Sequence, residues 1–271
     1  MPDEPVYSDD EPRTMTRRAL MRLGVAGSAI VGASALVTRA LSAESRSPFD
    51  APFRFEPIPR AGSRARAGVA APNIVERARW GADEGIRSRD IDFDETVEKI
   101  VVHHTGTPEP DGNWAAAVRD IYRSTVRRGY RDVPYHWLID PDGLVYEGRW
   151  ARPDRAGVTP TGEDARGRSV RGGHAKGHNA RSIGVALLGN FTDAAPSDAA
   201  FVSLVAVVAW KCARWDIDPA GESPYAMRDG STQVIPNICP HRRIRATACP
   251  GGPVVDLLPE LRFAVAQRVA A

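Results

Sequence analysis

A short β-branched run from Val97 to Val102 constrains the fold of this chain more than any other sequence feature. Charged residues flank the run, and its composition is typical of a strand that is buried on both faces of a sheet. Such a strand needs a covering layer on each side. We therefore expect a sheet between helices, with His103 and His104 at the carboxyl end of this strand, where functional sites are commonly built.

Three segments repeat apolar residues at helical spacing. Residues 113–128 predict a helix with Asn113 as its N-cap, and residues 197–214 predict a second helix. A closing helix is expected over residues 254–269, although Pro259 favours a first turn close to that residue. These helices supply the layers that a doubly buried strand requires.

Two further segments predict strands. Residues 135–146 contain two apolar runs around Asp142-Gly143, the turn chemistry of a β-hairpin, and residues 182–188 form another apolar strand. Residues 152–171 are polar and unpatterned, which predicts a long surface loop. Alternating strands and helices indicate an α/β fold, a single domain with a central mixed β-sheet flanked by helices.

The N-terminal residues 1–43 resemble a twin-arginine-type signal peptide. Arg17-Arg18 precede a mildly apolar run, Leu23 to Val37, which is shorter than the roughly 20 residues of a membrane-spanning helix. We expect export, an extracellular or cell-wall location and no stable membrane insertion after processing, with an uncleaved anchor as the alternative. Residues 44–73 predict a flexible linker, and residues 74–271 the folded domain.

Charge and cysteine content narrow the function further. The formal net charge of +2 over 271 residues gives no signature of nucleic-acid binding. Three cysteines are an odd number, so at least one is not in an internal disulfide. In an exported protein, Cys212 and Cys239 could form a disulfide or remain as separate thiols, and the sequence leaves both open.

Two good zinc ligands, His241 and Cys249, lie close together on one irregular segment. A nearby His and Cys alone would be a weak signal. His103, far away in sequence at a strand end, offers a third donor, and catalytic zinc sites use three protein ligands. The sequence therefore predicts a Zn²⁺ site made by His103, His241 and Cys249.

Seven segments carry a combined motif pattern across nearly the whole expected domain. They are residues 79–82, 100–105 (Ile-Val-Val-His-His-Thr), 134–139 (Pro-Tyr-His-Trp-Leu-Ile), 143–149, 173–179 (Gly-His-Ala-Lys-Gly-His-Asn), 181–185 and 241–251. In order and approximate spacing, these segments resemble the type 2 N-acetylmuramoyl-L-alanine amidase and peptidoglycan recognition protein family.

This resemblance implies zinc-dependent hydrolysis of the amide bond between N-acetylmuramic acid and L-alanine. Carried over by motif, Tyr135 and Thr247 are expected to hydrogen-bond the oxyanion that develops during hydrolysis. His104, His174 and Asn179 are expected to line or order the substrate site. Peptidoglycan or muropeptides are the expected partners, and we expect a monomer.

Two other functions fit the same resemblance. One is a peptidoglycan-binding module without catalysis, although such family members typically lack the cysteine ligand, which Cys249 supplies here. The other is a zinc amidase acting on a different amide substrate. Zinc analysis together with product release from peptidoglycan would separate these alternatives.

Overall fold

The computed structural model describes residues 68–110, 113–151, 160–227 and 229–271. They build a six-stranded sheet in the order β1-β5-β4-β7-β3-β10. Its strands are β1 (Ile74–Val75), β3 (Lys99–His104), β4 (Trp137–Ile139), β5 (Val145–Glu147), β7 (Ser182–Leu187) and β10 (Ile238–Pro240). β4 and β5 pair antiparallel, whereas the other neighbours are parallel, so the predicted mixed sheet is confirmed.

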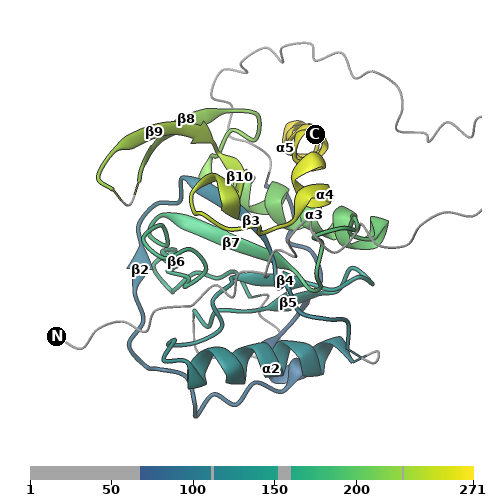
Figure 1. Cartoon of the computed structure of the whole chain (residues 1–271). Coiled ribbons are helices and arrows are strands. Elements are labelled where there is room, and N and C mark those ends of the chain that lie inside the picture. Colours follow the sequence, from purple (N-terminus) through teal and green to yellow (C-terminus); the bar gives the residue numbers. More distant parts are fainter. Residues whose placement is uncertain (1–67, 111–112, 152–159, 228) are drawn as a thin grey trace, which may run out of the picture. The chain divides into compact units, whose positions relative to one another are not determined.

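Helices cover both faces of this sheet (Figure 1). α1 (Arg77–Trp80) and α2 (Trp114–Arg127) lie against one face, and α3 (Asp198–Trp215), α4 (Gly252–Asp256) and α5 (Leu258–Ala270) lie against the other. Ile100 and Val102 of β3 point into the core beneath α3 and α5. Because side chains alternate along a strand, Val101 and His103 face the opposite side.

Polar caps explain where the two long helices begin. The Asn113 side chain accepts a hydrogen bond from the Ala116 amide at 2.9 Å, and the Ser197 hydroxyl accepts one from the Ala200 amide at 3.1 Å. Both predicted helices are confirmed to within about one residue at each end. The expected closing helix is divided into α4 and α5, and Pro259 lies in the first turn of α5 as its sequence position indicated.

Several short strands were not predicted. β2 (Phe93–Asp94) pairs with β6 (Ser169–Val170), and β8 (Glu222–Ala226) forms a hairpin with β9 (Thr232–Pro236). Lys99 at the start of β3 holds this hairpin. Its buried ammonium lies 3.1 Å from the Ile235 carbonyl, 3.1 Å from the Ser223 carbonyl and 2.8 Å from the Asn237 side-chain oxygen.

The two cysteines outside the metal motif are separate thiols. Cys212 on α3 is buried in the core on one face of the sheet. Cys239 on β10 is buried beside Val101 on the other face. Because the sheet lies between them, a disulfide between these two cysteines is excluded, and the disulfide alternative left open by the sequence is wrong.

The described part of the predicted surface loop, from Pro160 onward, is anchored to α3. Glu163 is largely buried, with one carboxylate oxygen 3.1 Å from the Lys211 ammonium and the other 2.9 Å from the Arg214 guanidinium. Burial lowers the pKa of Lys211 to about 8, against the effect of Glu163. Residues 152–159 of the predicted loop lie outside the described residues.

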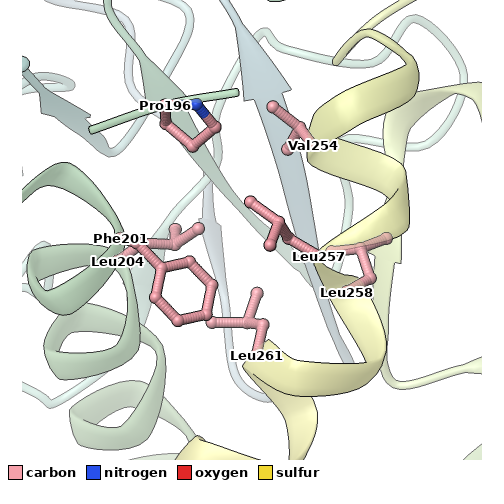
Figure 2. Close-up of a pocket in the computed structure, with 7 residues that line it drawn as sticks. All are labelled: Pro196, Phe201, Leu204, Val254, Leu257, Leu258 and Leu261. Atoms are coloured by element: carbon pink, nitrogen blue, oxygen red, sulfur yellow. The ribbon is translucent and has the colours of Figure 1, made fainter. Parts of the chain in front are cut away.

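An apolar hollow lies between α3 and the C-terminal helices (Figure 2). Its lining comprises Pro196, Phe201, Leu204, Val254, Leu257, Leu258 and Leu261. The hollow is on the face of the sheet opposite His103, and its lining has no polar side chain that could bind a cation. It is therefore separate from the candidate site described below.

Arg77 joins α1 to the sheet through a buried network. Its guanidinium lies 2.7 Å from a Glu84 oxygen and 3.1 Å from an Asp132 oxygen, donates to the Gly148 carbonyl, and lies 5.2 Å from the centre of the Trp80 ring. Arg77 and Asp132 are both nearly inaccessible to solvent. The Asp132 carboxylate is therefore paired with Arg77, whereas the Arg77 charge is also compensated by Glu84.

We expect Arg77→Met to lower the free energy of unfolding by about 3–5 kcal/mol, because it leaves the Asp132 carboxylate buried without its cation. Urea unfolding followed by circular dichroism would measure this loss. The matched control is Arg123→Met, which removes an exposed arginine 4.0 Å from Asp120 and should change stability by less than about 0.5 kcal/mol. Equal losses in the two variants would contradict the assigned role of Arg77.

Candidate metal centre

Three side chains from distant parts of the sequence meet at one edge of the sheet. His103 is in β3, His241 begins the short 3₁₀ helix η1 (His241–Arg243), and Cys249 lies in the turn before α4. The ligand atoms of these three residues all lie within 4.8 Å of one another. The parallel pairing of Pro240 with Val102 explains the convergence, because His241, which directly follows Pro240, is thereby placed beside His103, which follows Val102 near the carboxyl end of β3.

His103 presents one ring nitrogen to this cluster. Its Nδ1 lies 3.7 Å from the Cys249 sulfur, and its Nε2 lies 3.0 Å from Nδ1 of His174. The side chain is only 1% exposed, and burial, followed by the neighbouring imidazoles, holds the pKa of His103 well below its usual value. The ring is therefore neutral at pH 7, the form that binds a metal.

His241 is half-buried, and its ring centre lies 4.5 Å from that of His103. Its Nε2 is buried and has no hydrogen-bond partner among the described residues. Burial, followed by the charge of Arg245, lowers the pKa of His241 to about 4. An uncompensated nitrogen lone pair inside a protein is costly, and a bound cation would compensate it.

Cys249 completes the donor set. The backbone amide of His104 donates to its sulfur at 3.4 Å. Burial raises the pKa of the thiol to about 12, although this amide opposes the shift. A divalent cation is the partner that would stabilise the thiolate here, and its binding would release the thiol proton.

The distances agree with the dimensions of a zinc site. Zinc–nitrogen bonds of about 2.0–2.1 Å and zinc–sulfur bonds of about 2.3 Å in a tetrahedron place a nitrogen and a sulfur ligand about 3.6 Å apart. His103 Nδ1 and the Cys249 sulfur are 3.7 Å apart. Two neutral imidazoles and one thiol are also the ligand types that zinc accepts.

The two residues expected to act on the oxyanion lie beside this cluster. The half-buried Tyr135 ring is centred 5.2 Å from the His103 ring. The Thr247 hydroxyl accepts a hydrogen bond from the Cys249 amide at 3.3 Å. Because that contact uses an oxygen lone pair, the hydroxyl hydrogen of Thr247 remains able to donate elsewhere.

The residues expected at the substrate site have defined contacts. His104 accepts a hydrogen bond from the Phe191 amide through Nδ1 at 3.2 Å, so the hydrogen of its neutral ring is on Nε2. Asn179 accepts one from the Ala175 amide at 2.7 Å and thereby closes a turn. His174 is buried beside Nε2 of His103, whereas the Cys249 sulfur lies beside Nδ1 of the same ring.

Two residues of β7 that shape the site were not predicted from the sequence. The Ser182 hydroxyl lies 3.3 Å from Nε2 of His174, and Gly184 leaves the space that the His174 ring occupies. The available signal was the presence of Ser182 and Gly184 at alternate positions in an otherwise apolar strand, which places two small residues on one face.

A mixed sheet with two imidazoles and one thiol gathered at its edge defines a class of α/β proteins able to hold a divalent cation. The chain belongs to one particular family within this class, because residues 93–252 match the N-acetylmuramoyl-L-alanine amidase family model, Amidase_2. The sequence resemblance to type 2 amidases and peptidoglycan recognition proteins is thereby confirmed.

Individual relatives of both kinds are similar to this chain. A human protein named N-acetylmuramoyl-L-alanine amidase is 31% identical over 197 residues, which cover 71% of this chain but only 29% of that longer protein. A peptidoglycan-recognition protein of Drosophila melanogaster is 31% identical over 199 residues, covering 72% of this chain and 88% of that protein. The crystal structure of Drosophila peptidoglycan recognition protein SD shares the fold, with a TM-score of 0.53 at 24% identity over 70% of this chain and 95% of that one.

Proposed function

We propose that this protein is a zinc-dependent amidase that hydrolyses the bond between N-acetylmuramic acid and L-alanine in peptidoglycan. The observation that carries the proposal is the convergence of His103, His241 and Cys249 within 4.8 Å. The family includes proteins named amidases and proteins named recognition proteins. The thiol of Cys249 favours amidase activity over binding alone, because it completes the three protein ligands of a catalytic zinc site, which a domain that only binds peptidoglycan does not need.

Zinc fits the donors of this chain. His103, His241 and Cys249 would hold the ion, and the unpartnered Nε2 of His241 supports that assignment. When bound in such a site, zinc supplies Lewis-acid polarisation of a carbonyl and lowers the pKa of water from about 15.7 to roughly 7.

The surrounding side chains supply hydrogen-bond donors for amide hydrolysis. Tyr135 and Thr247 flank the ligands, and their hydroxyl groups would stabilise negative charge on the carbonyl oxygen of the scissile amide. The departing alanine nitrogen needs a proton. Tyr135 is one candidate to provide it, and the Nε2–H of His104, directed by the Phe191 contact, could order a water for the same purpose.

We further propose that the protein is exported and acts on peptidoglycan or muropeptides outside the cytoplasmic membrane. This location rests on the arginine pair and apolar run in residues 1–43, which lie outside the described residues. In the part of the chain that the structure describes, no helix has both the length and the hydrophobicity to cross a membrane.

We expect the purified protein to bind zinc and Cys249→Ala to lose this binding. The affinity should fall by more than the 10–100-fold typical of losing an outer-shell partner, because a direct ligand is removed. Competition with a chromophoric chelator measures this change. Cys239→Ala is the matched control, since Cys239 is also buried but is not part of the donor cluster. Equal zinc affinity in both variants would show that Cys249 is not a ligand.

The reaction is tested by mass spectrometry of purified sacculi after digestion. We expect released stem peptides with a free L-alanine amino group, together with glycan chains that retain lactyl muramic acid, and no release by Cys249→Ala. Binding to sacculi without any product would instead support a recognition module. Cleavage of a different amide would support another substrate.

Loss of the Tyr135 hydroxyl should slow the chemical step without removing zinc. We expect Tyr135→Phe to lower kcat by about 10²–10³-fold, as removal of an oxyanion donor does in other hydrolases. The exposed Tyr130→Phe serves as the matched control and should leave kcat unchanged. Nearly full turnover of zinc-loaded Tyr135→Phe would exclude the assigned role.

A further inference from the structure

A chain of hydrogen bonds leads from the backbone of the 175–179 turn, through Ser182 and His174, to Nε2 of His103. The Ser182 hydroxyl lies 2.7 Å from the His178 carbonyl and 3.3 Å from Nε2 of His174. Nδ1 of His174 lies 3.0 Å from Nε2 of His103. These residues lie on the face of the sheet opposite α3 and α5, and they are nearly inaccessible to solvent.

The direction of this chain of hydrogen bonds is determined at Ser182. Its hydroxyl has a single hydrogen and is close to two carbonyl oxygens, those of His178 at 2.7 Å and Asn179 at 3.2 Å, which can only accept. The contact with the His178 carbonyl is the shortest of these, and a carbonyl has two lone pairs, so it can accept from Ser182 as well as from the Tyr225 hydroxyl at 2.9 Å. The Ser182 hydrogen therefore points to this carbonyl, and the oxygen offers His174 a lone pair. It follows that Nε2 of His174 carries a hydrogen and donates it to Ser182.

The same direction continues to His103. His174 is hydrogen-bonded to the hydroxyl and the backbone of Ser182 and to another imidazole, none of which carries a compensating charge, so the buried ring is neutral. Its Nδ1 is then a lone pair, which accepts the Nε2 hydrogen of His103. The remaining nitrogen of His103, Nδ1, is left without a hydrogen and faces the Cys249 sulfur.

Two glycines leave room for the His174 ring. A Cβ atom at position 184 would lie well inside van der Waals contact with that ring, and one at position 172 would meet it at 2.7 Å. Glycine occupies both positions. The absence of side chains there lets His174 lie directly against β7, within reach of both Ser182 and His103.

We propose that His174 is a positioning residue that holds His103 in the tautomer that binds metal, through hydrogen bonds oriented by Ser182. The proposal deepens the proposed function and rests on it in so far as His103 is a zinc ligand. His174 itself touches neither substrate nor metal in this role. It prepares the Nδ1 lone pair of His103 before any cation arrives.

The first test measures the tautomer in the metal-free full chain. Nitrogen-15 spectra of the histidine rings, with His103→Gln used for assignment, should show a hydrogen on Nε2 of His103 that exchanges slowly with water. In Ser182→Ala and His174→Leu that hydrogen should exchange faster, and the Nδ1–H form should become populated. Observation of the Nδ1–H form in the unaltered protein would overturn the proposal.

The second test measures zinc affinity by chelator competition. His174→Leu should bind zinc about 10–100-fold more weakly, the usual effect of removing an outer-shell partner. His174→Asn should recover most of the affinity, because its side-chain oxygen can accept from His103 as Nδ1 does. Ser182→Ala should weaken binding in the same direction as His174→Leu and, as the smaller change, retains the fold more readily.

His136→Leu provides the matched control for lost stability. His136 is a buried histidine that bonds the Gly184 amide at 3.0 Å and the Val170 carbonyl at 2.8 Å. Its ring packs edge-on against that of His174, with the ring centres 5.7 Å apart, but it makes no hydrogen bond to His174, Ser182 or His103 among the described residues, so it controls for packing in the same region. If His174→Leu loses no more zinc affinity than His136→Leu, the proposal is wrong. If the unaltered protein binds no zinc, the proposed function fails instead, and the tautomer measurement still decides the role of His174.

Discussion

The parallel pairing of β10 with β3 is the constraint on which the candidate metal centre depends. Because Pro240 lies opposite Val102, the next residues of the two segments, His241 and His103, lie at the carboxyl ends of the two strands. Backbone hydrogen bonds then turn the following segment back on itself, including one from the Arg242 amide to the Cys249 carbonyl at 2.9 Å. Main-chain interactions of β3, β10 and the segment that follows β10 thus bring the donors together.

Burial gives this centre its electrostatic character. It lowers the pKa values of His103 and His241 and raises that of Cys249, so all three donors favour their uncharged forms when no cation is present. Neutral imidazoles are ready to bind a metal, whereas the thiol must first lose its proton. Only a strong local positive charge can compensate the buried thiolate, and this requirement favours a doubly charged ion.

Much of the fold could be predicted from the sequence, because its main elements have strong local signals. The caps at Asn113 and Ser197 define two helices, and the apolar strands follow from their β-branched composition. β10 is only three residues long, and its place beside β3 depends on long-range pairing that local sequence does not encode. The donor set could be predicted from the ligand types of His103, His241 and Cys249 and from the strand end at His103, and the motif resemblance supports the same set. The contact between His174 and Ser182 could not be predicted, because it depends on how the loop that carries His174 packs on one face of the sheet.

Lys99 and His103 lie near opposite ends of β3, so the same strand contacts the β8–β9 hairpin at one end and carries a candidate metal ligand at the other. The Lys99 ammonium contacts the β8–β9 hairpin through the main-chain carbonyls of Ser223 and Ile235 and through the Ser223 hydroxyl. The two carbonyls are present whatever side chains the hairpin carries, whereas the hydroxyl contact requires Ser223. One end of β3 is thus attached to its neighbour partly by main-chain groups, while the other end, at His103, depends on particular side chains.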